Sequence, residues 1–174
     1  MHEHSYYETL AEYNAWMNEK LYRVCAEIPD ELRKKDLGAF FRSIHGTLNH
    51  LLLADIVWMA RFTGQPLTRA ALDQELHSDF DDLRREREAM DRRILDWTRT
   101  LSPERLAQPF SYTSVSDGKT RTRPFWLLVT HLFNHQTHHR GQLTTLLSQL
   151  GYDYGVTDLP WLPSLCELDS AKTE

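Results

Sequence analysis

Apolar residues recur every three or four positions in four long segments of the chain. This spacing is typical of amphipathic helices that bury one face. The first predicted helix covers roughly residues 4–28 and ends at Pro29-Asp30. Asn14 and Asn18 lie on its apolar stripe, where a simple core would have leucine.

The second and third predicted helices differ in how much of their surface is apolar. The second covers roughly residues 37–63 and is apolar on more than one face, which predicts burial beyond its own bundle or contact with a partner chain. The third, roughly 74–101, has a narrow stripe that is interrupted at Arg87, and a densely charged outer face. We interpret that charge as a solvated surface. Arg87 could anchor an anion, but we favour a side chain that extends to the surface along its apolar stem.

A long connection separates the third and fourth helices. Within it, Asp117-Gly118 lies between two short segments that favour strands, which predicts a small hairpin. Pro124 suits the first turn of a fourth helix that runs to about Leu150, with Gly151 in the position that ends it. The tail is too rich in Gly and Pro for another long helix. We expect it to pack across the bundle through its apolar side chains: Tyr152, Tyr154, Leu159, Trp161 and Leu162.

Four amphipathic helices around one core predict an all-α fold, a four-helix bundle with a long connection between helices 3 and 4 that carries the hairpin. We expect residues 1–174 to form a single domain.

The sequence has 41% hydrophobic and 26% charged residues and no run of 18 apolar residues, so no membrane span is expected. A net charge of −5 argues against binding to a nucleic-acid backbone. Two distant cysteines, Cys25 and Cys166, and a start without secretory features predict reduced thiols in the cytoplasm.

Four of the nine histidines lie in the stretch HLFNHQTHHRGQ, residues 131–142. The apolar stripe of the fourth helix passes through His135 and His139, which are one turn apart and can converge on one ion. By spacing alone, His131 and His135 form an alternative pair. An unpaired buried polar group costs about 1–3 kcal/mol, and a shared ion would satisfy both rings. We therefore favour a metal site over two core histidines with local partners.

A third ligand should come from a facing helix, because bundles build their sites between helices. His50 on the second helix lies on a face of mostly small residues that leaves room beside it, although it could instead be a core histidine with a local partner. His45 lies on another face and His77 opens the charged third helix, so neither is assigned to the site. Three neutral imidazoles leave a coordination position open, as catalytic sites do. Nitrogen ligands suit Zn or Ni foremost, with Fe, Co and Cu as alternatives.

Five segments together resemble the DinB family, the damage-inducible, YfiT-like metal-binding bundles. They are YNAWMNEKL, GTLNHLLLAD, the SDG turn, HLFNHQTHHRGQL and GYDYGVTDLPWLP, in this order along the whole chain. The resemblance implies a metal triad of His50, His135 and His139, and it implies dimers. Related members are thiol-dependent transferases or isomerases that use bacillithiol, mycothiol or glutathione. The similarly named Y-family polymerases are unrelated to this family.

The functional expectation is a metal-dependent enzyme with a small-molecule substrate, namely a transferase that uses a low-molecular-weight thiol as co-substrate. One alternative is a hydrolase that activates water at the same metal, and another is a non-enzymatic metal-binding stress or interaction protein. Asn14, Asn18 and His131 are predicted to line the substrate pocket, although the asparagines could instead pair within the bundle. A homodimer is expected, and neither nucleic acid nor a membrane is expected as a partner. A pocket that reaches the metal would favour an enzyme, whereas a sealed site would favour a structural role.

Overall fold

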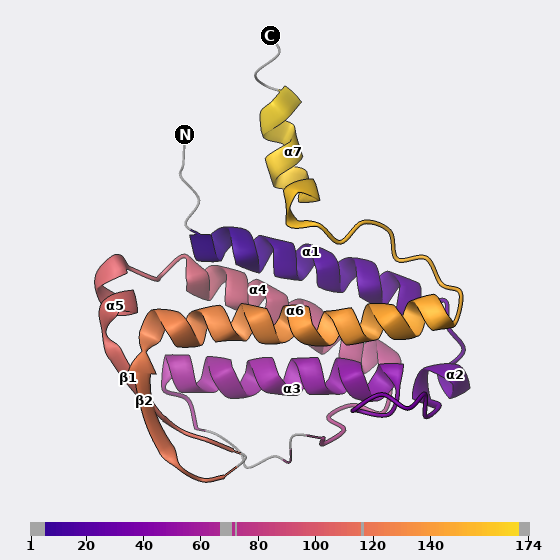
Figure 1. Cartoon of the computed structure of the whole chain (residues 1–174), viewed down its shortest axis with the longest axis horizontal. Coiled ribbons are helices and arrows are strands. Elements are labelled where there is room, and N and C mark those ends of the chain that lie inside the picture. Colours follow the sequence, from indigo (N-terminus) through magenta and orange to yellow (C-terminus); the bar gives the residue numbers. More distant parts are fainter. Residues whose placement is uncertain (1–5, 67–70, 72, 116, 171–174) are drawn as a thin grey trace.

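The computed structural model describes residues 6–66, 71, 73–115 and 117–170, the last four of them by their backbone alone. Four long helices lie side by side: α1 (Tyr6–Ala26), α3 (Ile44–Thr63), α4 (Phe80–Thr98) and α6 (Phe125–Gln149) (Figure 1). Helices α1 and α3 each pack against both α4 and α6, so α1 and α3 occupy opposite corners. The predicted all-α four-helix bundle is confirmed.

Shorter elements connect the long helices: α2 (Asp30–Lys34), α5 (Pro103–Ala107), β1 (Pro109–Thr113) and β2 (Thr120–Pro124). The two strands pair antiparallel, with Pro109 opposite Pro124 and Thr113 opposite Thr120, which confirms the predicted hairpin. The hairpin lies at the end of the bundle where α3 ends and α6 begins (Figure 1). Helix α6 ends as predicted, because Gly151 adopts the left-handed backbone conformation with φ of +80°.

Two long helices begin later than the sequence pattern predicts. Helix α3 starts at Ile44 instead of near residue 37, because Arg42 has a left-handed φ of 66° and the Ser43 side chain accepts a hydrogen bond from the Gly46 N–H. Helix α4 starts at Phe80 instead of near residue 74, where the Asp79 side chain caps the Asp82 N–H. In both cases apolar residues continue the helical spacing into a segment that is not helical.

The tail crosses α1 and then leaves the bundle. The Tyr13 hydroxyl donates to the Thr157 backbone oxygen, and Lys20 donates to the backbone oxygen of Val156. Leu162 is buried, as expected, but Trp161 remains 60% exposed, so its predicted packing is wrong. A 3₁₀ turn (Leu159–Trp161) leads into α7 (Pro163–Ser170), which extends away from the bundle (Figure 1).

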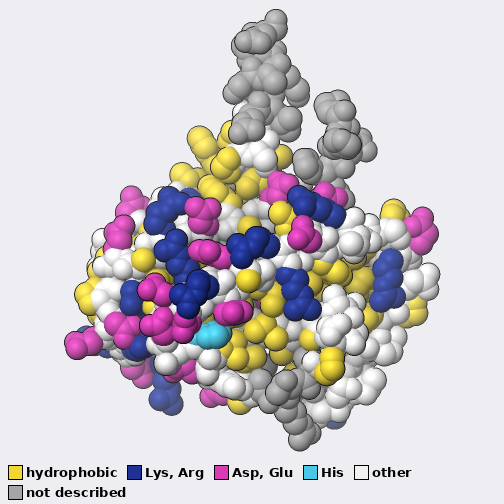
Figure 2. Space-filling view, turned by 180° about the vertical axis from the view of Figure 1, so that it is seen from behind, with side chains coloured by type: hydrophobic (Ala, Val, Ile, Leu, Met, Phe, Trp, Pro, Cys, Tyr) yellow, Lys and Arg dark blue, Asp and Glu magenta, His cyan; other side chains and the backbone are white. Residues whose placement is uncertain are grey.

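The outer face of α4 carries acidic and basic side chains side by side, as Figure 2 shows from that side of the molecule. Pairs such as Arg84 with Glu88, 3.1 Å apart, are exposed. The interpretation of this charge as a solvated face is confirmed. None of the described helices combines the length and the apolar character that a membrane span requires.

Two charged residues of α4 turn inward instead, since Arg87 is only 2% exposed and Asp91 7%. Nη1 of Arg87 lies 2.8 Å from Oδ2 of Asp55 on α3, and its Nη2 lies 2.8 Å from Oδ1 of Asp91. The prediction that Arg87 extends to the surface is therefore wrong. Two buried carboxylates supply the opposite charge that a guanidinium needs inside a core.

Asn14 and Asn18 extend this polar cluster to α1. Both side-chain amides donate to Asp91, at 3.2 Å and 2.9 Å from Oδ1. Arg140 on α6 donates in turn to the Asn14 side-chain oxygen. All four long helices thus contribute to one buried polar network, which fixes α6 relative to its neighbours.

Candidate metal centre

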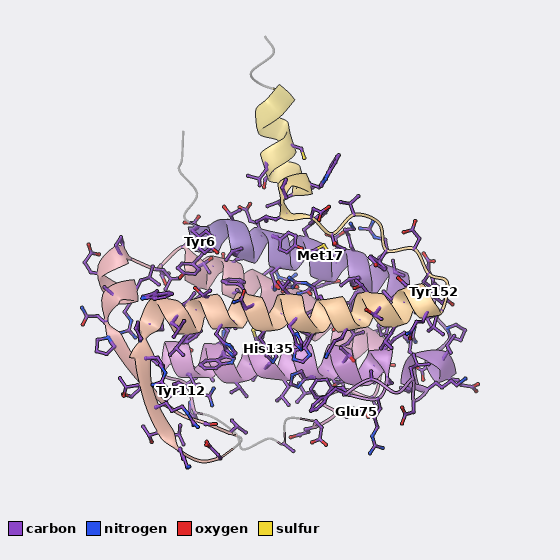
Figure 3. All side chains as sticks on the ribbon, viewed as in Figure 1. Tyr6, Met17, Glu75, Tyr112, His135 and Tyr152 are labelled. Carbon is purple, nitrogen blue, oxygen red and sulfur yellow. The ribbon has the colours of Figure 1, made fainter. Side chains whose placement is uncertain are left out.

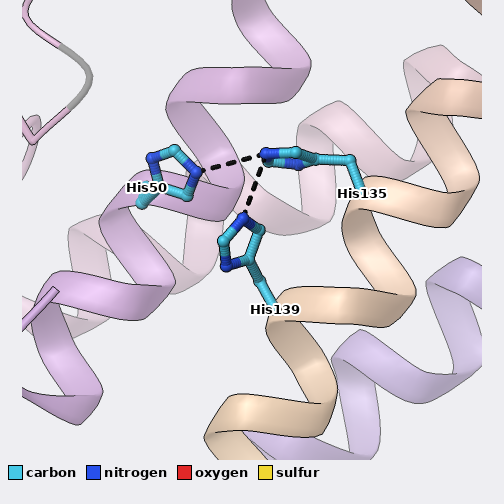
Figure 4. A group of neighbouring side chains, drawn as sticks. All are labelled: His50, His135 and His139. Carbon is cyan, nitrogen blue, oxygen red and sulfur yellow. Dashed lines mark hydrogen bonds between the residues drawn. The ribbon is translucent and has the colours of Figure 1, made fainter. Parts of the chain in front are cut away.

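Three histidine rings from α3 and α6 meet between these two helices, at the position where Figure 3 shows His135 on α6. Nε2 of His135 lies 3.3 Å from Nε2 of His50 and 3.1 Å from Nε2 of His139 (Figure 4). One ligand atom from each residue lies within 4.8 Å of the others. Zn–N bonds of 2.0–2.1 Å in a tetrahedral site place ligand nitrogens about 3.3 Å apart. The three nitrogens are therefore spaced so that they could share one metal ion.

Local structure explains why the rings converge. His135 and His139 are one turn apart on α6 and face α3, where His50 lies. The ring of Phe41 stacks on His50 with centroids 3.7 Å apart, and it meets His139 edge-on at 5.4 Å. His50 and His139 are buried, whereas His135 is partly exposed.

Gly46 allows Phe41 to reach this position. A Cβ atom at residue 46 would lie 2.3 Å from the backbone oxygen of Phe41, closer than any van der Waals contact allows. The absence of a side chain therefore lets the segment before α3 fold back against the first turn of the helix. The sequence pattern placed Phe41 inside a helix and so missed its role beside the histidines.

The hydrogen-bonding capacity of the rings fits a shared cation. Nδ1 of His139 lies 2.8 Å from Oε1 of Gln142, and because an amide oxygen only accepts, Nδ1 carries the hydrogen and Nε2 presents a lone pair. Nε2 of His135 can donate at most one hydrogen, yet it faces Nε2 of both other rings. A cation at the centre would accept the lone pairs that these rings direct at one another.

Protonation of His135 and of His139 is disfavoured. Burial, followed by the charges that His139 and His50 would carry, lowers the pKa of His135 to about 3. Burial also lowers the pKa of His139, although the hydrogen bond to Gln142 opposes the shift. Neutral imidazoles are the form that binds metal ions, so His135 and His139 are held in the competent state at neutral pH.

A cavity of about 230 Å³ opens beside His50 and His135. The hairpin closes one side of it, and α3 and α6 form the others. Its remaining lining residues are Leu53, Ala54, Val57, Trp58, Arg61, Tyr112, Ser114, Val115 and His131. The three-histidine group is therefore not sealed inside the bundle.

The other residues considered from the sequence lie in several places. His131 lines the cavity, with its ring 5.1 Å from that of Trp58, whereas Asn14 and Asn18 hold Asp91 and do not line it. His45 is buried, and its Nε2 lies 2.8 Å from the backbone oxygen of His77, which precedes α4 instead of opening it.

Sequence reasoning missed three further residues: Gln142 contacts His139, and Arg61 and Tyr112 line the cavity. Gln142 follows His139 by three residues, a spacing that lets side chains on one helix meet, but it was assigned no role from the sequence. Arg61 follows His50 by eleven residues, which is three helical turns, and this spacing could have placed it on the same face of α3. Nothing in the sequence indicated that Tyr112 of the hairpin would close the cavity.

These features define a class of protein: a four-helix bundle that brings three histidines from two facing helices to the edge of a cavity. The sequence profile of the DinB family matches residues 1–169, and the chain therefore belongs to the DinB family.

One relative supports this assignment, and one solved structure shares the fold. "Protein DinB" of Bacillus subtilis (strain 168) is 32% identical over 155 residues, which cover 86% of this chain and 88% of that protein. The crystal structure of a DinB-like protein from Bacillus cereus ATCC 10987 shares the fold with a TM-score of 0.58. At 18% identity, the match covers 81% of this chain and 90% of that one.

Proposed function

We propose that His50, His135 and His139 hold a divalent transition metal and that the chain is a metal-dependent enzyme acting on a small molecule. The observation that carries this proposal is the cavity of about 230 Å³ that reaches His50 and His135. A purely structural metal site is closed by four protein ligands. Among the described His, Cys, Asp and Glu side chains, the group has three members, which supports an open position for a substrate.

The reaction that we propose is the transfer of a low-molecular-weight thiol to an electrophilic substrate, as the sequence resemblance implies. When bound, a divalent cation lowers the pKa of a coordinating thiol or water, so that a nucleophile is available near neutral pH. The residues of the chain would orient the reactants: Gln142 fixes the His139 ring, Phe41 shields one face of His50, and His131 lines the substrate side. A hydrolase would use the same site.

We propose Zn or Ni as the metal, with Fe, Co and Cu as further candidates. Imidazole nitrogens suit all of these ions, whereas Mg and Ca prefer oxygen. No carboxylate belongs to the three-histidine group among the residues that the structure describes. The two free cysteines, Cys25 and Cys166, support a reducing compartment, and we propose the cytoplasm.

Metal content tests the first part of the proposal. Protein purified without a histidine tag should contain about one equivalent of a transition metal per chain by elemental analysis. His135→Ala should lose most of it, because two nitrogens bind an ion far more weakly than three. His138→Ala is the matched control, since His138 is an exposed histidine on the same helix. Full metal content in His135→Ala would contradict the proposal.

Turnover tests the second part. The metal-loaded protein should conjugate bacillithiol, mycothiol or glutathione to an electrophile, and His135→Ala should lose this activity while its circular dichroism stays unchanged. Hydrolysis of esters without thiol transfer would favour the hydrolase. A metal-loaded protein that is inactive with a broad panel of thiols and esters would favour a non-enzymatic role.

A further inference from the structure

We propose that the cavity beside the histidines takes an organic monocarboxylate with an apolar body, and that Arg61 binds its carboxylate. This inference rests on the proposed function, because it identifies the substrate class of the same cavity. It assigns the reactive end of the substrate to the histidines and the anionic end to Arg61.

The first argument is the charge of the cavity. Arg61 is the one permanently charged side chain among its described lining residues, which include no Asp or Glu. No carboxylate of the described residues forms an ion pair with Arg61. Partial burial lowers the pKa of Arg61, as expected for a guanidinium that lacks a compensating anion. An anionic ligand would supply the missing charge.

The second argument is that Arg61 is held in place. Its guanidinium carbon lies 4.5 Å from the centre of the Trp58 ring and 5.1 Å from that of Tyr112. Nη2 donates to the backbone oxygen of Thr113 at 2.7 Å, while Nε is buried and has no hydrogen-bond partner among the described residues. A guanidinium fixed by two rings and one hydrogen bond loses little entropy when it binds an anion.

The third argument is the shape and chemistry of the space between the two ends. Arg61 follows His50 by three helical turns, so their backbone positions lie about 16 Å apart along α3. Ala54 and Val57 leave room between them, and Leu53, Trp58 and Tyr112 form mostly apolar walls. Figure 3 shows Tyr112 on the hairpin and His135 on α6, and both residues line the cavity. An elongated apolar body with one terminal charge suits such a space.

The charge balance also favours a carboxylate over a phosphate. One guanidinium matches a single negative charge, and no Lys and no second Arg lines the cavity within the described part of the chain. A phosphate monoester carries close to two negative charges at neutral pH and would remain partly uncompensated.

Binding of hydrocinnamate to the full-length protein tests the proposal by isothermal titration calorimetry. Its neutral analogue, hydrocinnamyl alcohol, has the same body without the charge and should bind at least about tenfold more weakly. Arg61→Met keeps the apolar stem but removes the charge, and it should weaken hydrocinnamate binding by about tenfold or more while leaving the alcohol unaffected. Arg61→Lys should bind hydrocinnamate with an affinity between those of the wild type and Arg61→Met.

Arg105→Met is the matched control. Arg105 also stacks on aromatic rings, 4.5 Å from the centre of Phe125, but it lies outside the cavity. This variant should bind hydrocinnamate like the wild type. The Nε–H signal of Arg61 in NMR spectra should also shift on addition of the acid, which a purely structural arginine would not show.

The titrations are run on both metal-free and zinc-loaded protein. If Arg61→Met weakens hydrocinnamate binding in both forms, the carboxylate site is supported even if the metal proposal fails. If binding instead requires zinc and is the same in Arg61→Met as in the wild type, the carboxylate site is overturned. Equal affinity for acid and alcohol, an equal loss in Arg105→Met, or no binding of the acid up to about 10 mM would overturn it as well.

Discussion

Gly46 shows how one missing side chain shapes the candidate site. Its backbone lies so close to the Phe41 oxygen that no Cβ fits, and Phe41 in turn stacks on His50. The position of the His50 ring thus depends on a residue that contacts neither a metal nor a substrate.

Gly46→Ala should destabilise the fold by about 1–3 kcal/mol, because the segment that carries Phe41 must move to admit the methyl group. Urea denaturation followed by tryptophan fluorescence would measure this loss. Gly141→Ala is the control, since a Cβ there meets nothing within 4 Å and Gly141 lies within α6. That change should be neutral or stabilising by up to about 1 kcal/mol. Equal effects of the two substitutions would contradict the role assigned to Gly46.

At the scale of the elements, the buried polar network joins all four long helices. Arg87 on α4 pairs with Asp55 on α3 and with Asp91, to which Asn14 and Asn18 on α1 also donate. The network explains why two asparagines and one arginine interrupt apolar stripes that would otherwise be complete.

Arg87→Met should cost about 3–5 kcal/mol of unfolding free energy, because it leaves two buried carboxylates without their countercharge. Arg84→Met, which breaks an exposed pair with Glu88 on the same helix, should cost less than about 1 kcal/mol. Chemical denaturation of both variants provides the comparison. A loss in Arg87→Met as small as that in Arg84→Met would show that the ion pairs do not stabilise the fold.

Helical spacing predicted the four long helices because each helix buries one stripe of side chains. Such a stripe is visible in the sequence as apolar residues that recur every three or four positions. The prediction failed at Phe40 and Phe41, where apolar residues continue the spacing but Arg42 adopts a left-handed backbone. The facing pair of His135 and His139 follows from spacing on one helix. The inward turn of Arg87 and the position of Tyr112 depend on partners from other elements, Asp55 and Trp58, which no local pattern reveals.

At the scale of the whole molecule, the apolar excess of α3 no longer requires a partner chain. Sixteen of its residues are buried within the chain itself. Several large apolar side chains remain exposed elsewhere, and two of them, Trp126 at 47% and Leu127 at 40%, are neighbours in the first turn of α6. We propose that this pair contributes to the contact between the chains of a homodimer.

Sedimentation velocity should give twice the chain mass for the wild type. A double substitution of Trp126→Glu and Leu127→Glu should give the mass of one chain, because two charges at a shared apolar contact repel and cannot be desolvated cheaply. Trp161→Glu, which changes another exposed tryptophan, should leave the dimer intact. A monomeric wild type, or a dimer that survives the double substitution, would contradict this interface.

The most direct measurement of the central claim is the position of the bound ion. Crystals of tag-free protein loaded with zinc, measured at the zinc absorption edge, should show one anomalous peak per chain about 2.0–2.1 Å from a ring nitrogen of His50, His135 and His139. At saturating zinc, a peak elsewhere, or three rings without an ion between them, would contradict the account.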